Sequence, residues 1–324
     1  MHTPFLRAAL HLFNGDENEP VRLSGGNFST VYEFVQSGKP AILRLTPPGA
    51  SIDITSMTSI LHWMRYLADH AVSVPGQLLS RQGRLVETLH DDQGTWLASA
   101  VEKARGVRAE TLAFGDWNER RFSRLGRETG KMHRVSRGYQ PPEIILPRPR
   151  WDETGNNFNP IDELENAEPL ILQRRMQVIE DLNSLSCSPD GCGLVHADLQ
   201  CANFFIDPVD DTITLFDFDD CCYGWFMMDV ALPLLDFLVL YPGHDRKAFA
   251  YRFLESFLTG YRAEYPLDLR KLYKLPVFLK LLEIGLYLQV YRFAQNASPD
   301  SWVGKFIPER RELILADEPF VELA

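Results

Sequence analysis

The stretch between residues 196 and 220 holds the side chains of this sequence that are best suited to chemistry. It contains an aspartate, Asp198, followed five positions later by Asn203, and a second aspartate, Asp217, further on. Carboxylate and amide oxygens are hard ligands of the kind that Mg²⁺ prefers. A carboxylate beside a metal-bound phosphate can orient an alcohol and accept its proton. These three side chains therefore predict a magnesium site with a base next to it, provided that the fold brings them together.

Two β-prone runs, residues 204–207 and 212–216, separate Asn203 from Asp217. The four residues between the runs, Pro-Val-Asp-Asp, have the composition of a turn. If the runs pair as an antiparallel hairpin, residues whose numbers sum to about 419 lie opposite one another. Asn203 would then lie beside Phe216 or Asp217. We therefore expect the open end of this hairpin to hold an amide and a carboxylate oxygen, with the loop that carries the other aspartate just ahead of it.

Each of these residues also has an ordinary structural explanation. A single Asp or Asn in a loop is more often a turn former or a helix cap than a catalyst. The joint pattern is different, because His-x-Asp-x4-Asn, then a hairpin, then an aspartate at its far end is improbable as an accident. We therefore interpret the combination, rather than any one residue, as a kinase-like site.

This pattern resembles the aminoglycoside phosphotransferase and choline kinase superfamily, whose members are distant relatives of protein kinases. The resemblance extends from Leu23 to about Phe293, nearly the whole chain. It implies that Asp198 is the base and that Asn203 and Asp217 hold Mg²⁺. It also implies ATP as the phosphoryl donor and a hydroxyl of a small molecule as the acceptor.

Further roles follow from the same resemblance. His196 would help to orient the catalytic loop, and Asp229 would support that loop from a helix. Residues 102–106 would form the hinge between two lobes, where the carbonyl of Glu102 and the N–H of Ala104 would meet the adenine edge. These hinge contacts use backbone atoms, so the identities of the side chains give them little support.

A segment with two glycines lies between two predicted strands, residues 21–23 and 31–35. It is not a Walker P-loop, which needs a strand, a loop with a lysine and then a helix. It resembles the hairpin loop that closes over the ATP phosphates in kinases, where glycines let backbone N–H groups approach phosphate oxygens. A plain hairpin is the better explanation of the glycines taken alone, and the other motifs favour the phosphate loop. The residues concerned are Gly25, Gly26, Asn27, Phe28 and Ser29.

The third predicted strand, residues 41–45, places Ile42 and Arg44 on one face because side chains alternate along a strand. Kinases put an apolar residue against adenine and a cation on the phosphates at this spacing, and arginine can bind phosphate bidentately. A surface arginine on an edge strand is the alternative. The partner helix departs from the kinase pattern, because residues 54–68 contain no acidic residue and the nearest carboxylate is Asp53. Arg44 therefore pairs elsewhere or needs no partner.

The acceptor site is harder to derive from the sequence. In this family the acceptor lies in the helical lobe, often with its amine held by carboxylates. Asp219 is the best candidate, because it follows a proposed metal ligand by two residues and should face the same way. A structural role is at least as plausible for each candidate, and an aminoglycoside, choline or ethanolamine, homoserine, a sugar and a protein serine or threonine all remain open as acceptors. The candidates are Asp219, Asp220, Asp152 and Trp225.

The periodicity of the chain changes near residue 106. Before that point short strands surround one apolar-periodic helix, and after it the pattern is mostly helical. We therefore expect an α+β, two-lobed, protein-kinase-like fold with an N-lobe at 1–101, a hinge at 102–106 and a helical C-lobe at 107–324. The expected strands are 21–23, 31–35, 41–45, 85–89 and 96–101, and the expected helices are 60–67, 122–135, 169–185, 245–261 and 275–293.

The composition narrows the class of protein. A chain of 324 residues with 45% hydrophobic and 24% charged residues is typical of a globular protein, and a net charge of −11 argues against a nucleic-acid partner. The first residues show neither a cluster of positive charge nor a cleavage signature, so we expect no signal peptide. The most apolar run, residues 225–241, is interrupted by charges, so we expect a core helix and no membrane span. Five cysteines without a secretory context predict reduced thiols and a cytoplasmic location. The oligomeric state stays open.

Three functions fit these features. The leading one is ATP- and Mg²⁺-dependent phosphoryl transfer to a hydroxyl. The second is a non-catalytic nucleotide-binding or protein-docking module on the same fold, which the missing helix glutamate supports and the presence of all three site residues opposes. The third is a metal-dependent hydrolase, which explains the aspartates but neither the glycine segment nor Arg44.

Overall fold

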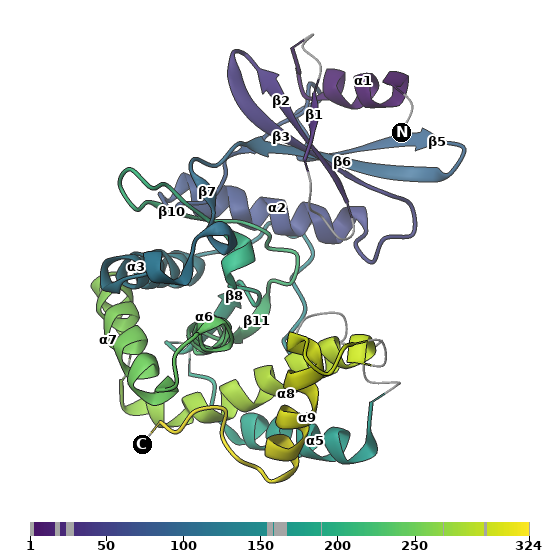
Figure 1. Ribbon diagram of the computed structural model, residues 1–324. Coiled ribbons are helices and arrows are strands. Elements are labelled where there is room, and N and C mark those ends of the chain that lie inside the picture. Colours follow the sequence, from purple (N-terminus) through teal and green to yellow (C-terminus); the bar gives the residue numbers. More distant parts are fainter. Residues whose placement is uncertain are drawn as a thin grey trace.

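The computed structural model of the protein describes residues 3–16, 20–23, 29–153, 158, 167–188, 190–267, 269–294 and 297–323. The chain folds into two lobes, a small one built on an antiparallel sheet and a larger one that is mostly helical (Figure 1). The α+β, two-lobed, kinase-like fold expected from the sequence is confirmed.

The N-terminal lobe is a twisted sheet with a helix on each side (Figure 1). Its strands pair in the order β1-β2-β3-β6-β4, and β5 pairs with β6 as well. All of the predicted strands of this lobe are found, with ends shifted by at most a few residues. The elements are α1 (Thr3–Leu12), β1 (Val21–Arg22), β2 (Thr30–Gln36), β3 (Lys39–Thr46), α2 (Ile54–Asp69), β4 (Gln77–Leu78), β5 (Val86–Asp91) and β6 (Gly94–Glu102).

The side chains of β3 alternate between a face in the hydrophobic core and a face directed toward the C-terminal lobe. Leu43 and Leu45 are fully buried in a cluster with Phe13 at the end of α1. Ile42 and Arg44 are half-buried on the opposite face, as their spacing predicts. Helix α1 thus covers the outer face of the sheet, and the other face is left to α2 and the C-terminal lobe. This helix is not among the elements predicted from the sequence.

The two lobes meet at a short connection after β6. This strand ends at Glu102, and the next one, β7, begins at Val107. Gly106 has φ +83°, and a Cβ there would lie 2.0 Å from the carbonyl oxygen of Ile206, so a side chain has no room where the chain enters the C-terminal lobe. The boundaries 1–101, 102–106 and 107–324 stay a proposal.

The C-terminal lobe packs its helices around α6 and also carries two small sheets (Figure 1). The predicted helices are found as α3, α5, α7 and α8, while α9 and the β8–β11 pair were not predicted. The helices are α3 (Glu119–Ser136), α5 (Pro169–Ser184), α6 (Met228–Leu240), α7 (Arg246–Glu264), α8 (Leu275–Ala294) and α9 (Trp302–Leu315), and the 3₁₀ turns are η1 (Ala109–Thr111), η2 (Phe114–Asp116), η3 (Cys201–Asn203) and η4 (Leu269–Lys274). The strands are β7 (Val107–Arg108), β8 (Cys192–Val195), β9 (Phe204–Ile206), β10 (Ile213–Leu215) and β11 (Cys222–Trp225).

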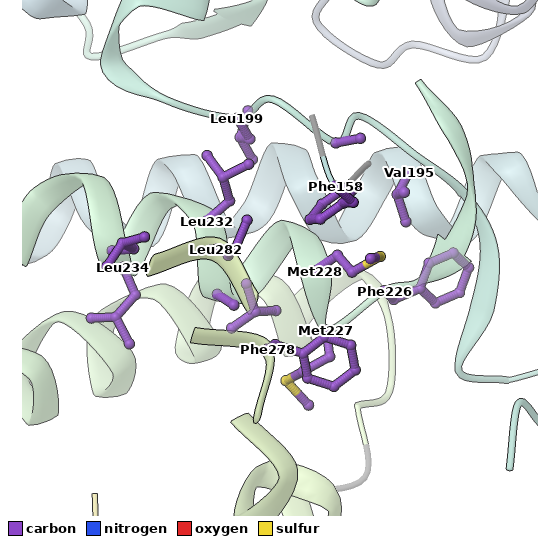
Figure 2. Close-up of a cluster of buried hydrophobic side chains, with 14 of the residues drawn as sticks. Phe158, Val195, Leu199, Phe226, Met227, Met228, Leu232, Leu234, Phe278 and Leu282 are labelled. Atoms are coloured by element: carbon purple, nitrogen blue, oxygen red, sulfur yellow. The ribbon is translucent and has the colours of Figure 1, made fainter. Parts of the chain in front are cut away.

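The apolar run at 225–241 forms the buried core helix that its composition predicts. Nearly every residue of α6 is buried, and Figure 2 shows Met228, Leu232 and Leu234 among side chains from other elements, including Phe278 of α8. Of the helices that the structure describes, none has the length and apolarity to cross a membrane. The position of Trp225 differs from the prediction, because it ends strand β11 instead of beginning the helix.

Helices α3 and α7 cross at glycines on both sides of the contact. A Cβ on Gly126 would lie 1.9 Å from the carbonyl oxygen of Phe257, and a Cβ on Gly260 would lie 1.8 Å from that of Ser123. Both helices therefore approach closer than any side chain allows.

Gly260→Ala is expected to lower the free energy of unfolding by about 2 kcal/mol, because the new methyl group forces α3 and α7 apart. The matched control is Gly115→Ala, since no atom lies within 4 Å of a Cβ at that position. Urea unfolding of both variants measures the difference. Equal stability of the two variants would contradict the close contact.

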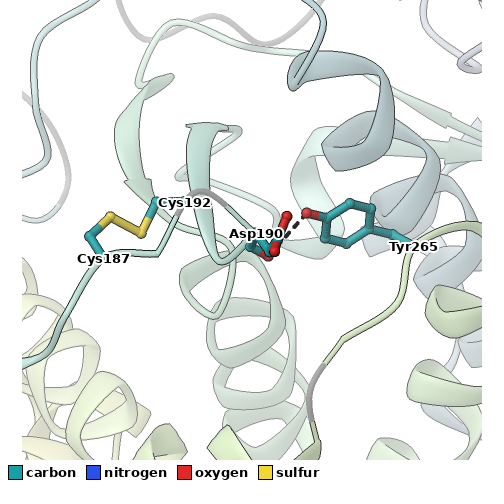
Figure 3. The surroundings of a disulfide bond; sticks show 4 residues. All are labelled: Cys187, Asp190, Cys192 and Tyr265. Atoms are coloured by element: carbon teal, nitrogen blue, oxygen red, sulfur yellow. Dashed lines mark hydrogen bonds between the residues drawn. A yellow bond between two sulfur atoms is a disulfide. The ribbon is translucent and has the colours of Figure 1, made fainter.

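One expectation about the cysteines is wrong. All five were expected to be reduced, but Cys187 and Cys192 form a disulfide with a Cα–Cα distance of 5.8 Å (Figure 3). The Gly191 N–H donates to the Ser188 carbonyl at 2.8 Å, and the disulfide links the segment after α5 to the first residue of β8. The remaining cysteines, Cys201, Cys221 and Cys222, are free and buried.

Candidate active site

The hairpin formed by β9 and β10 has the register that the sequence predicts. Ile206 lies opposite Ile213, and Phe204 lies opposite Leu215, so the paired numbers sum to 419. The Phe216 N–H donates to the Asn203 carbonyl at 3.0 Å, one step beyond the last strand pair. Asn203 and the residue after Phe216 therefore meet at the open end of the hairpin, as expected.

Asn203 and Asp198 are in direct contact. The Asn203 Nδ2 donates to Asp198 Oδ2 at 2.5 Å and to the Asp198 carbonyl at 2.9 Å. Gln200 Nε2 donates to the other carboxylate oxygen, Oδ1, at 3.0 Å. Because Nδ2 of Asn203 is directed at Asp198, Oδ1 of Asn203 is the side-chain atom that remains to bind a cation.

The loop that carries Asp198 is held from helix α6 by Asp229. One oxygen of this buried carboxylate accepts from the His196 N–H at 2.7 Å, and the other accepts from the Ala197 N–H at 2.9 Å. Ala197 has φ +67°, a left-handed conformation that a non-glycine residue adopts only when its surroundings impose it. The expectation that Asp229 supports this loop is confirmed by these bonds.

A chain of buried hydrogen bonds continues behind Asp229. His133 of α3 donates from Nε2 to Asp229 Oδ2 at 3.0 Å, and its Nδ1 lies 2.7 Å from the Tyr261 hydroxyl of α7. Burial would raise the pKa of Asp229, but the hydrogen bond and charge of His133 hold it below the ordinary value. Asp229 is therefore a charged group at the end of a hydrogen-bond chain that joins three helices, α6, α3 and α7.

A second aspartate of α6 also holds the loop. Asp236 lies seven residues after Asp229, on the same face of the helix, and its Oδ2 accepts from the Cys201 N–H at 2.8 Å. Cys201 begins the 3₁₀ turn that ends at Asn203. In the sequence, Asp236 stands out only as a charge within an apolar run, and its spacing from Asp229 is the signal that could have identified this role.

His196 connects the loop to the hairpin. Its Nε2 donates to the Phe216 carbonyl at 3.0 Å, and its Nδ1 accepts from the Asp198 N–H at 3.3 Å. Burial lowers the pKa of His196, which keeps the imidazole neutral and suits one donating and one accepting nitrogen. These contacts agree with the orienting role that the resemblance implies.

The carboxylates at the open end of the hairpin change one another's pKa values electrostatically. Burial, with the charges of Asp220 and Asp217, raises the pKa of Asp198 to about 8. Desolvation by the surrounding protein and the charge of Asp219 raise the pKa of Asp217 to about 6, against the lowering effect of Arg44, although the residue is exposed at the surface. The fold therefore gathers at one place the acidic groups that the sequence distributes over residues 198–220.

Arg44 of the N-terminal lobe contacts this group of carboxylates in the C-terminal lobe. Its Nη1 and Nη2 donate to the two carboxylate oxygens of Asp219 at 2.8 and 2.5 Å. Its Nε donates to the Ser29 hydroxyl at 3.0 Å. Arg44 is thus neither a free surface arginine nor paired with α2, and Asp219 supplies the carboxylate that the helix lacks.

The structure describes the other predicted nucleotide residues on β3 and at the end of β6, with one exception. Ile42 shares the face of β3 with Arg44. At the end of β6, Glu102 pairs with Ala41 in the sheet, and Ala104 follows two residues later in the connection between the lobes. The exception is the glycine segment, because Gly25, Gly26, Asn27 and Phe28 lie outside the described residues.

The remaining acceptor candidates lie in different environments. Asp220 is half-buried and acts on the pKa of Asp198, so it belongs to the carboxylate group. Asp152 forms an ion pair with Arg150, with Nε to Oδ1 at 3.0 Å. Trp225 packs its ring 5.1 Å from that of Trp151, measured between centroids. Whether these side chains contact an acceptor stays a prediction.

The fold and the sequence place the chain in a class of enzymes. The profile of the phosphotransferase enzyme family matches residues 20–267, which is most of the chain. The chain therefore belongs to the phosphotransferase enzyme family.

Particular relatives narrow this class. The chain is 34% identical to amicoumacin kinase of Bacillus subtilis (strain 168) over 281 residues, which cover 84% of this chain and 80% of the relative. It superimposes with a TM-score of 0.86 and 30% identity on an amicoumacin kinase solved with AMP-PNP, Ca²⁺ and Ami, over 98% of this chain and 94% of the other. A microcompartment-associated aminopropanol kinase shares the fold with a TM-score of 0.71 at 22% identity, over 98% of each chain. The protein is a small-molecule phosphotransferase of the kinase type that acts on a hydroxyl group.

Proposed function

We propose that this protein transfers the γ-phosphoryl group of ATP to a hydroxyl of amicoumacin or a small molecule of similar kind, with Mg²⁺ as its metal. The observation that supports this most is the contact of Asn203 with Asp198 at the end of the β9–β10 hairpin, beside Asp217. The identity of 34% with amicoumacin kinase supports the acceptor. Transfer from ATP also favours the cytoplasmic location expected from the sequence.

Asp198 is the proposed base. It must accept the proton of the acceptor hydroxyl while the phosphoryl group leaves ATP. Burial and neighbouring carboxylates raise the pKa of Asp198 to about 8 while no cation is bound. The charge of Mg²⁺ beside it would lower this pKa and keep the carboxylate ionised, as a base must be. The Asp198 carboxylate is held by Gln200 and Asn203, so its direction is fixed before the acceptor arrives.

Asn203 and Asp217 are the proposed ligands of Mg²⁺. Among the described residues no group of three or more His, Cys, Asp or Glu side chains is arranged to hold a metal ion. A set of one carboxylate and one amide oxygen fits Mg²⁺ nevertheless, because this ion usually keeps water and phosphate oxygens as its other ligands. The Oδ1 atom of Asn203 is directed away from Asp198 and suits this purpose. Bound Mg²⁺ would neutralise charge on the β- and γ-phosphates.

We place the proposed nucleotide site at the face of β3 that carries Arg44 and at the connection after β6. Arg44 would bind phosphate, Ile42 would lie against adenine, and the backbone of Glu102 and Ala104 would meet the adenine edge. The missing acidic residue of α2 was the reason to consider a non-catalytic module. Because Arg44 is held by Asp219 instead, this reason no longer applies.

The test is phosphoryl transfer from γ-labelled ATP by the wild-type protein with amicoumacin, aminopropanol and choline as separate acceptors, each with Mg²⁺ and with EDTA. We expect label in amicoumacin only when Mg²⁺ is present. Label in another acceptor would keep the reaction and change the substrate. Absence of label in every small molecule, together with label in an added protein, would replace the proposal with a protein kinase.

A further inference from the structure

The partner of Arg44 lies far away in the sequence. The only acidic residue of helix α2 is Asp69, its last one, so the helix opposite β3 offers no carboxylate near its middle. The guanidinium instead binds both oxygens of Asp219, which is 175 residues away along the chain. Arg44 of the N-terminal lobe is therefore ion-paired with the segment that carries the proposed metal ligand Asp217.

The ion pair is held from both sides. Ser29 Oγ accepts from Arg44 Nε and lies 2.8 Å from the Thr46 hydroxyl, which fixes the guanidinium within the sheet. Arg148 donates to the carbonyls of Asp219 and Cys221, each at 3.0 Å, which fixes the backbone that carries the carboxylate. The side chains are 26% and 31% exposed, so the pair is partly shielded from water.

The geometry leaves donors for phosphate. A guanidinium carries five N–H groups. Asp219 accepts from one N–H on each Nη of Arg44, and Ser29 accepts from Nε, so one N–H on each Nη remains. The charge of Asp217 also acts on Arg44. The guanidinium is thus bound to one carboxylate, Asp219, and close enough to the carboxylate proposed for the metal to feel its charge.

We propose that Asp219 is a positioning residue for phosphoryl transfer, which orients Arg44 toward the ATP phosphates in place of a glutamate on α2. This inference rests on the proposed function. It gives Asp219 a role in binding the nucleotide. The sequence alone favours a different role for Asp219, in binding the acceptor. The inference also means that the orientation of Arg44 depends on the segment of Asp217 and not on the position of α2.

The first experiment measures nucleotide affinity by calorimetry, without any acceptor. Asp219→Asn is expected to weaken Mg²⁺–AMP-PNP binding about fivefold, because one partly shielded ion pair contributes about 1 kcal/mol to the orientation of Arg44. The affinity for AMP, which lacks the β- and γ-phosphates, is expected to stay unchanged. Asp69→Asn, which removes the only acidic residue of α2, is the matched control and should leave both affinities unchanged. Thermal unfolding of each variant confirms that it is folded.

The second experiment is a double-mutant cycle on transfer to amicoumacin. Asp219→Asn is expected to lower kcat about thirtyfold with little change in the KM for the acceptor, since Arg44 stabilises charge in the transition state. Adding Arg44→Lys should cost little more, because both changes break one interaction.

Three results would overturn the inference: unchanged AMP-PNP affinity in Asp219→Asn, additive losses in the cycle, or a raised KM for the acceptor with kcat and AMP-PNP affinity intact. The last of these would return Asp219 to the acceptor site. If the wild type transfers no label to any acceptor, the proposed function fails, and the affinity experiment still decides the role of Asp219.

Discussion

Asp198→Asn is expected to lower kcat about 1,000-fold and to leave the affinity for ATP within about threefold of the wild type. Asparagine keeps the size of the side chain but cannot accept the proton of the acceptor hydroxyl. The contacts with nucleotide that we propose come from Arg44, Ile42 and the connection after β6, so the substitution leaves them in place. Initial rates with γ-labelled ATP and calorimetric titration with AMP-PNP measure the two effects separately.

The control for this substitution is Asp92→Asn, which removes a negative charge from an exposed turn of the N-terminal lobe. It is expected to change neither kcat nor nucleotide affinity. Loss of ATP binding in Asp198→Asn would contradict the role of a base, because it would show that the carboxylate holds the nucleotide complex. Full activity in Asp198→Asn would exclude Asp198 as the base.

Asp229→Ala is expected to lower the free energy of unfolding by about 4 kcal/mol and to reduce transfer strongly. The substitution leaves the buried N–H groups of His196 and Ala197, and Nε2 of His133, without their acceptor. The hydrogen bond that holds Ala197 in its left-handed conformation is then lost, so we expect the loop with Asp198 to change its shape. Urea unfolding measures the stability, and Asp181→Ala, an exposed aspartate of α5, serves as the control.

The dependence on pH gives this prediction a second readout. The pKa of Asp229 is lowered in the folded state, so its contribution to stability is present above the pKa of the unfolded chain, about 3.9, and is lost as the pH falls further. The difference in stability between the wild type and Asp229→Ala should therefore narrow below about pH 4. A difference that stays constant down to pH 3, with both proteins still folded, would mean that the charge of Asp229 is not what stabilises the loop.

The sequence by itself determined the parts of the site that depend on local structure. The register of the β9–β10 hairpin follows from two β-prone runs and a turn, and it places Asn203 beside Phe216 without any help from distant residues. The shared face of Ile42 and Arg44 follows from strand alternation alone. Most helices follow from apolar periodicity, which reports the buried face of a helix whatever it packs against.

Only the tertiary structure decided the partners across the molecule. The pairing of Arg44 with Asp219, the support of Cys201 by Asp236 and the disulfide between Cys187 and Cys192 all depend on where the chain returns after long or irregular segments. Periodicity says which face of an element is buried, but an ion pair or a disulfide requires two particular atoms to meet. Whether two such atoms meet depends on the packing of the lobes and on turns whose direction no local pattern specifies. For this reason the sequence shows that α2 lacks a carboxylate for Arg44, but it does not show that Asp219 takes the place of this carboxylate.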